Sequence, residues 1–428
     1  MNTKVHQYIA EKGFILLPIA IKKEWVNGKF FMVKTCMYPD IFADRDKSKK
    51  EKKKIDPEAD LYIEPLPPKA KWYKELCKKI LNNPTSFLSE TIPEKLIYLI
   101  FHYLKNTIMY LKKRDMERAG KFAGVFSHII GDIAQPIHLV NSRVLDLLIK
   151  CPDEFLSFEL HAGIEGISGR PIIKGYEPEI LGNSLPRAVM GLYKKILLMA
   201  EECRYTTPLM VKAIYSHHPE QAVKIAGISV KLATCVFSDF LRTVWAIAYK
   251  ENIPFKPFGL TDYPYIHSTV DMLYRYKPMK NISLIPYSGG KSYPLTLLDK
   301  NRQQVQVSGL GVIPYLGPLK SNLGTVQERD AKIDFFIWPE SYSWFKAKVG
   351  LNPLFKKSEG KVLFRIFADT KLIAKCGPIS PYTPYRDFEV KLPENIHFLT
   401  LSMLTIEEPS KPLAETHPHG VWGEPKLI

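Results

Sequence analysis

The sequence contains few cysteines, and none of them forms a C-x-x-C pair. Neither a zinc site built from thiolates nor a dense disulfide framework is therefore indicated, although the pattern leaves one or two bridges open. The six cysteines are Cys36, Cys77, Cys151, Cys203, Cys235 and Cys376.

Long apolar runs are also lacking. No run of 18 or more apolar residues occurs, so no membrane-spanning helix is predicted. A short apolar stretch near the start follows Glu11 and Lys12 and is interrupted by Pro18, which does not fit a secretory signal peptide. From these two absences the chain as given is expected to be cytoplasmic, unless a leader has been removed.

The chain has 428 residues and is 46% hydrophobic, which is enough for two packed domains. Its net charge is +16, and the excess is spread along the chain. Lys and Arg outnumber Asp and Glu by 39 to 29 in residues 1–265 and by 21 to 15 in residues 266–428. Such a charge is typical of a solvated surface, with mild affinity for anions such as phosphate, nucleic acid or lipid head groups.

Residues from about 91 to 250 have helical periodicity. The stretch "TIPEKLIYLIFHYLKNTIMYLKK" has apolar residues at three-and-four spacing, with Thr91 as N-cap and Pro93 in the first turn. Asp115 is predicted to cap the next helix, and Pro136 to end it. The further helices are predicted at 116–134, 185–202 and 219–250.

The pattern changes near Asn252. Residues 253–284 are rich in proline and glycine, which indicates a linker. Beyond it, runs such as "KIDFFIW", "SWFKAKVGLN" and "KVLFRIFA" are typical of strands at the spacing of a β-sandwich. The predicted fold class is multidomain α + β. An all-α helical bundle in residues 1–252 is followed by a jelly-roll-like β-sandwich in residues 285–428.

Metal-type side chains lie within apolar sequence at "FSHIIGDIAQPIHLV". His128 and Asp132 are four residues apart, so a helix places both on one face, and His138 follows in a turn. A second pair at the same spacing, His161 and Glu165, occurs in "FELHAGIEG". Burying so many ionisable groups without a partner costs several kcal/mol each. Imidazoles and carboxylates are good ligands of Zn²⁺, so the pattern predicts a metal cluster.

The segment "HIIGDIAQPIH" resembles the signature of the zinc-dependent phospholipase C family and of the related zinc nucleases specific for single strands. The resemblance covers roughly residues 1–250, and Glu165 in the second pair is typical of the phospholipases. It implies further ligands at His6, at Asp40 or its substitute Asp44, and at a position where this chain has Asp60 instead of histidine. Family members also use an N-terminal tryptophan, whereas this chain begins with Met1.

The resemblance implies two or three Zn²⁺ ions. One site would use Asp40, Asp60, His128 and Asp132, and another His138, His161 and Glu165. A third would use His6 and a bridging Asp132. The implied activity is hydrolysis of a phosphodiester by metal-activated water, with Asp40 as the residue that orients or deprotonates the water.

The C-terminal part has a resemblance of its own, to the carbohydrate-binding-module-like domain abbreviated NPCBM that accompanies many glycosidases. Phe345, Val349, Gly350, Phe364 and Trp422 lie at the matching places. The physical pattern predicts that Trp422 fills the core of the sandwich. Aromatic residues that could stack on sugar rings are Trp338, Tyr342 and Trp344.

Together these patterns favour a zinc phosphodiesterase of the phospholipase C type with a glycan-binding or surface-binding module. A phospholipid or another phosphodiester would be its substrate, and peripheral membrane contact is compatible with this. The alternatives are a single-strand-specific zinc nuclease and a catalytically inactive, metal-stabilised binding protein, which Asp60 and Met1 favour. The family resemblance implies export, in conflict with the absence of a leader.

Overall fold

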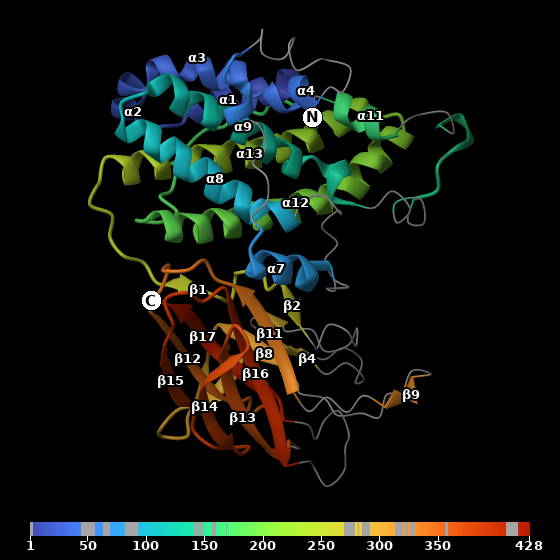
Figure 1. Cartoon of the computed structure of the whole chain (residues 1–428). Coiled ribbons are helices and arrows are strands. Elements are labelled where there is room, and N and C mark those ends of the chain that lie inside the picture. Colours follow the sequence, from blue (N-terminus) through green and yellow to red (C-terminus); the bar gives the residue numbers. More distant parts are fainter. Residues whose placement is uncertain are drawn as a thin grey trace. The chain divides into compact units, whose positions relative to one another are not determined.

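The computed structural model describes most of the chain in two compact units (Figure 1). The first unit comprises residues 1–69 and 87–254, and the second comprises 70–86 and 255–428. The described residues are 3–43, 56–62, 69–81, 93–140, 145, 149–155, 160–167, 169–268, 279–280, 282–284, 292–312, 320–321, 324–325, 330–355, 358–407 and 418–428.

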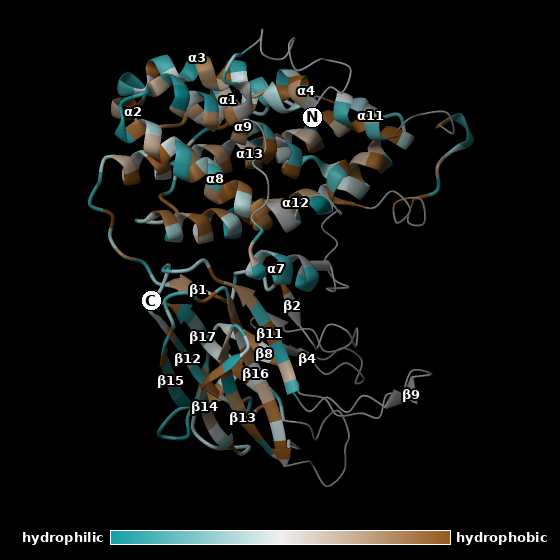
Figure 2. Cartoon of the chain, in the orientation of Figure 1, coloured by the Kyte–Doolittle hydropathy of each residue, from teal (hydrophilic) through white to brown (hydrophobic). Residues whose placement is uncertain are grey.

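The first unit is helical, as predicted. In Figure 2 hydrophobic and hydrophilic residues lie side by side along its helices, as expected when each helix buries one face. None of the described helices combines the length and the apolar character needed to cross a membrane. The helices are α1 (Thr3–Ile15), α2 (Ile19–Glu24), α3 (Val26–Thr35), α4 (Tyr38–Ala43), α6 (Ala59–Tyr62), α8 (Pro93–Lys112), α9 (Met116–Ala134), α11 (Leu160–Gly166), α12 (Leu185–Tyr215) and α13 (Pro219–Ala248), with 3₁₀ turns η1 (Pro136–Leu139) and η2 (Asp153–Phe155).

The limits of α9 follow from its sequence. The side chain of Asp115 accepts a hydrogen bond from the backbone nitrogen of Arg118 at 3.0 Å, which confirms the predicted N-cap. The helix ends at Ala134, and Pro136 begins η1. The predicted cap Thr91 of α8 lies outside the described residues.

The helix α12 is longer than predicted, because it continues through Pro208 to Tyr215. A proline inside a helix costs about 3 kcal/mol. The residues that follow it, including Met210 and Val211, are buried in a hydrophobic cluster with Ile137 and Ile164. Burial of these side chains offsets the cost, and the sequence pattern alone could not show that burial.

The N-terminal helices α1 to α4 were not predicted. They are short, and α3 has apolar residues on several sides, so its periodicity is weak. It packs closely on α9 because α9 has glycine at the contact. A side chain on Gly124 would come within 2.2 Å of the Thr35 hydroxyl, and one on Gly120 within 2.5 Å of the Gly28 carbonyl oxygen.

The second unit is a sandwich of two antiparallel sheets. One has the order β15-β12-β17-β8-β3 with β1 also paired to β17, and the other has the order β14-β13-β16-β11-β2. The strands are β1 (Phe258–Gly259), β2 (His267–Ser268), β3 (Met279–Lys280), β8 (Gly309–Val312), β11 (Asp330–Phe336), β12 (Trp344–Leu351), β13 (Lys361–Ala368), β14 (Lys371–Ile379), β15 (Arg386–Lys391), β16 (Phe398–Glu407) and β17 (Gly420–Leu427), with hairpins β4 (Ile282–Leu284) and β5 (Ser292–Pro294), β6 (Thr296–Leu298) and β7 (Gln304–Gln306), and β9 (Lys320–Ser321) and β10 (Gly324–Thr325).

The predicted strands are confirmed, and so is the role of Trp422. This residue is fully buried, and its ring lies 5.0 Å from Phe364 in the opposite sheet and 6.1 Å from Phe345. Residues along β13 alternate regularly between buried and half-buried positions, as the sequence pattern predicts for a strand with one face in the core.

The stretch 253–284, interpreted as a linker, contains strands. Within it β1 pairs with β17, β2 with β11 and β3 with β8. Each of these three strands has two residues, which is too short for an alternating pattern to appear in the sequence. The stretch therefore contributes strands to both sheets.

A helix from the N-terminal half of the sequence belongs to the second unit. This helix, α7 (Lys71–Leu81), lies against the sandwich. Its Trp72 stacks on His397 at 4.9 Å and approaches Trp338 at 5.9 Å. Its Lys79 forms an ion pair with buried Asp334 at 2.5 Å. The second unit is therefore built from two separate segments of the chain, which the sequence did not predict.

Candidate metal centre

The first group of metal-type side chains lies on α9, with one residue each from α1 and α4. His128 Nε2 is 3.0 Å from Asp132 Oδ2 and 3.3 Å from Asp40 Oδ1. His6 Nε2 is 3.4 Å from Asp132 Oδ1, and its ring stacks on His128 at 3.9 Å. We call His6, Asp40, His128 and Asp132 the first cluster. It unites residues that the resemblance divided between two sites.

The environment of His6 fits a metal ligand. The residue is fully buried, and neither ring nitrogen makes a hydrogen bond of good geometry with a described residue. Buried polar atoms without a partner are rare, because each costs about 1–3 kcal/mol. Space for the ring exists because residue 131 is glycine: a side chain there would approach His6 Nδ1 to 2.8 Å. A cation at Nε2 would remove the cost.

The electrostatics of the first cluster also favour a positive charge between its carboxylates. Burial lowers the pKa of His128, but the carboxylates of Asp132 and Asp40 outweigh it and raise that pKa to about 9. Burial raises the pKa of Asp132, and the two imidazoles reverse this and hold it well below its usual range. Burial lowers the pKa of His6, which therefore stays neutral as a ligand must.

The second group comprises His138 of η1 with His161 and Glu165 of α11, and we call it the second cluster. Glu165 Oε1 is 2.9 Å from His138 Nε2 and 3.5 Å from His161 Nε2. The two rings are 5.2 Å apart. One carboxylate oxygen therefore faces two imidazole nitrogens, as it would around a shared cation. Ile164, buried between these ligands in sequence, holds α11 against Ile137 of η1.

The two clusters are adjacent, because Asp132 of the first cluster also contacts His138 of the second. Its side chain faces His6 and His128, while its backbone oxygen is 3.1 Å from His138 Nδ1. This contact fixes the ring so that Nε2 is directed at Glu165. Asp40 and His161 are each 56% exposed, whereas His128 is 3% exposed. Buried imidazoles thus form the base of the centre, and exposed groups form its rim.

The structure does not describe the side chains of the remaining predicted ligands. Asp60 is placed in α6, but its side chain is outside the described residues, as are Asp44 and Met1. The assignment of Asp60 stays a prediction. In the described ranges of the chain, two groups of such side chains have ligand atoms close enough to share a cation: His6, Asp40 and His128, and His138, His161 and Glu165.

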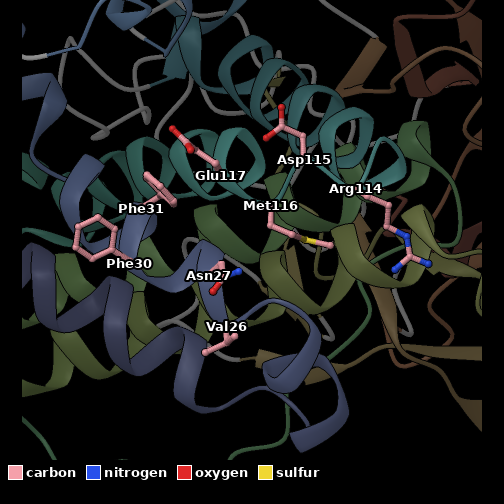
Figure 3. A pocket seen from close by; sticks show the side chains of 8 residues that line it. All are labelled: Val26, Asn27, Phe30, Phe31, Arg114, Asp115, Met116 and Glu117. Carbon is pink, nitrogen blue, oxygen red and sulfur yellow. The ribbon is translucent and has the colours of Figure 1, made fainter.

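A hollow elsewhere on the first unit contains no member of either cluster. It lies between the start of α3 and the junction of α8 with α9 (Figure 3). Phe30 and Val26 face it from one side, and Arg114 and Glu117 from the other. Several of its charged groups are already paired, among them Arg114 with Glu24 at 3.6 Å. It offers no chemistry comparable to that of the clusters.

Supporting contacts that the sequence did not reveal hold the first cluster. His128 Nδ1 is 2.7 Å from the backbone oxygen of Cys36, just before α4. The buried Tyr38, which begins α4, donates a hydrogen bond to Asp56 at 2.8 Å. The one signal in the sequence for a close approach at this place was Gly131, between His128 and Asp132.

The cysteines 36, 151, 203, 235 and 376 are free, so none of them forms a bridge.

No protein-family model matches the chain, and no curated protein matches it in sequence. Among solved structures, the alpha-toxin of Clostridium perfringens strain SWCP is 11% identical and has a TM-score of 0.33, with 92% of this chain and 83% of that chain covered. The alpha toxin of Clostridium absonum is 12% identical with a TM-score of 0.32, covering 99% and 94%.

A CBM51 module of Clostridium perfringens GH95, solved with methyl-galactose, is 15% identical with a TM-score of 0.29. It covers 40% of this chain and 100% of that chain. The solved structures similar to this chain thus include alpha-toxins over almost its whole length and a carbohydrate-binding module over part of it.

Proposed function

We propose that the protein is a zinc-dependent phosphodiesterase of the phospholipase C type. The observation that carries the proposal is the convergence of His6, Asp40, His128 and Asp132 beside His138, His161 and Glu165. Imidazole nitrogens and carboxylate oxygens in this ratio are the ligands that zinc prefers. Two observations support the fit: the buried nitrogens of His6 make no hydrogen bond of good geometry, and Gly131 lets the His6 ring approach closely.

Bound zinc would supply Lewis-acid polarisation of phosphate oxygens and lower the pKa of water toward neutrality. The residues of the chain would do the rest. Asp132 would hold the two clusters at a fixed separation through its side chain and its backbone oxygen. Asp40, at the exposed rim, would orient the attacking water and accept its proton at a carboxylate oxygen. Glu165 would keep His138 and His161 directed at one point.

The second unit would bind a glycan or another surface ligand. Of the three aromatic residues proposed from sequence, Trp344 is 39% exposed, whereas Tyr342 is buried and Trp338 packs against Trp72. Trp344 is therefore the residue of the three that we assign to stacking on a sugar ring. Replacement of Trp344 by alanine should abolish binding on a glycan array without changing the hydrolytic activity.

The test of the enzymatic proposal combines metal counting with activity. Purified protein should contain at least two zinc ions per chain by mass spectrometry. It should hydrolyse a chromogenic phosphocholine diester or phosphatidylcholine vesicles, and lose this activity with a chelator. The variant His138→Ala should lose at least about 100-fold in activity and one equivalent of zinc.

The matched control is His217→Ala. His217 is also paired with a glutamate, since its Nε2 is 3.0 Å from Glu154 Oε1, but this pair is exposed and belongs to neither cluster. The variant should retain full activity and full metal content. Cleavage of single-stranded DNA instead of the choline diester would identify a nuclease. Fewer than two zinc ions with no turnover would support a metal-stabilised binding protein and refute the proposal.

A further inference from the structure

The segment 56–62 is fastened to α9 by buried polar contacts that neither cluster uses. Asp56 is 4% exposed and receives three donors: the Tyr38 hydroxyl at 2.8 Å, the Glu58 backbone nitrogen at 2.9 Å and Lys121 Nζ at 3.1 Å. Lys121 lies on α9 and is itself 8% exposed. A buried ion pair of this kind adds little to the free energy of unfolding on average. We therefore ask whether it fixes the position of neighbouring residues instead.

The contact from Tyr38 leads directly to the first cluster. Tyr38 is the first residue of α4, and Asp40 lies two positions later in the same short helix. A helix of six residues is not stable by itself, so its orientation depends on such tertiary contacts. The Cys36 backbone oxygen, just before α4, lies 2.7 Å from His128 Nδ1. The start of α4 therefore influences two ligands at once.

We propose that Asp56 is a positioning residue for the first cluster. Held by Lys121 of α9, it anchors Tyr38 and thereby keeps Asp40 within reach of His128 and the Cys36 carbonyl in line with that ring. The inference rests on the proposed function, because it assumes that the first cluster binds a divalent cation. Contacts outside the ligand shell of a metal commonly change its affinity by 10- to 100-fold.

The contact has a close counterpart elsewhere in the first unit. Tyr176 donates to the buried Asp239 of α13 at 2.7 Å, and Lys195 lies 3.3 Å from the same carboxylate. The arrangement of tyrosine, aspartate and lysine is the same as at Asp56. No member of either cluster lies on α13, so Tyr176→Phe removes a similar bond without reaching the first cluster.

The experiment measures Zn²⁺ affinity of the full-length protein by competition with a chromogenic chelator. The background variant Glu165→Gln weakens the second cluster, so that the first is measured. In this background Tyr38→Phe and Asp56→Asn should each lower the affinity at least about 10-fold. Tyr176→Phe should leave the Zn²⁺ affinity within twofold. It should lower the melting temperature by about as much as Tyr38→Phe does. Tyr38→Phe removes one oxygen only, so it keeps the test valid if Asp56→Asn fails to fold.

Two outcomes overturn the inference, and they are distinguishable. If the unmutated chain binds Zn²⁺ but both variants keep their affinity within twofold, Asp56 is structural and the proposed function stands. If the unmutated chain binds no Zn²⁺, the proposed function and the inference both fail. A parallel Co²⁺ titration should show a changed visible absorption band in Tyr38→Phe and an unchanged band in Tyr176→Phe.

Discussion

Two groups of carboxylates, one in each unit, differ in how their charge is balanced. In the sandwich, Asp334 is buried but satisfied, with Lys79 at 2.5 Å and a hydrogen bond from Thr400. Asp330 is likewise held by Arg365 and by Ser402. In the helical unit, the first cluster brings two imidazoles and two carboxylates together, and neither nitrogen of His6 makes a hydrogen bond of good geometry. The comparison teaches that these two aspartates of the sandwich are paired by cations and hydroxyls of the chain itself, whereas the first cluster groups imidazoles and carboxylates that could share a cation.

Removal of metal should separate the two units most clearly. A ligand at 100 times its dissociation constant stabilises the folded state by about 2.7 kcal/mol, and in a unit of this size each kcal/mol shifts the melting temperature by about 2–4 °C. Chelation should therefore lower the helical transition by roughly 5–10 °C in calorimetry and leave the sandwich transition in place. Equal shifts of both transitions would break the comparison.

A smaller change tests the space around His6. In Gly131→Ala the new methyl group would approach His6 Nδ1 to 2.8 Å and displace the ring. Zinc affinity should fall about 10-fold or more, although alanine favours the helix by about 1 kcal/mol. The control is Gly227→Ala in α13, where the nearest atom would be at 3.8 Å. It should keep its affinity, and the same loss in both variants would contradict the role of this space.

The attachment of α7 can be tested on the sandwich. Trp72→Ala removes the stacking on His397 and the contact with Trp338. Because Trp72 is half-buried, the free energy of unfolding of the second unit should fall by about 2 kcal/mol. The helical transition and the zinc content should not change. Trp344→Ala, at the exposed start of β12, should cost less than about 1 kcal/mol. An equal cost of the two substitutions would contradict the attachment of α7 to this unit.

The smallest expected effect concerns pH. Burial, with a contribution from Lys105, lowers the pKa of His102 from 6.5 to about 4. As the pH falls, the unfolded chain therefore binds a proton at His102 before the folded chain does. The free energy of unfolding is highest above pH 6.5 for this group, and it decreases as the pH falls toward 4. By pH 5 the loss should reach about 2 kcal/mol in the helical unit. His102→Gln should remove this part of the pH dependence in denaturant titrations, and an unchanged curve would contradict the assignment.

Much of the secondary structure was predictable, because its signals are local. The cap at Asp115, the stop at Pro136 and the alternation along β13 each depend on a few neighbouring residues. The extension of α12 beyond Pro208 was not predictable, because burial of later residues decides it. The strands within 253–284 were missed for a related reason, since two-residue strands exist only through their partners.

For the site, the sequence by itself determined the ligand types and the two pairs at four-residue spacing. His128 with Asp132 and His161 with Glu165 share a helix face whatever the rest of the chain does. Only the tertiary structure decided that His6 and Asp40 join the first pair, that His138 joins the second, and that Asp132 connects them. Helical geometry fixes neighbours within one turn, whereas contacts between distant segments arise from the packing of the whole unit.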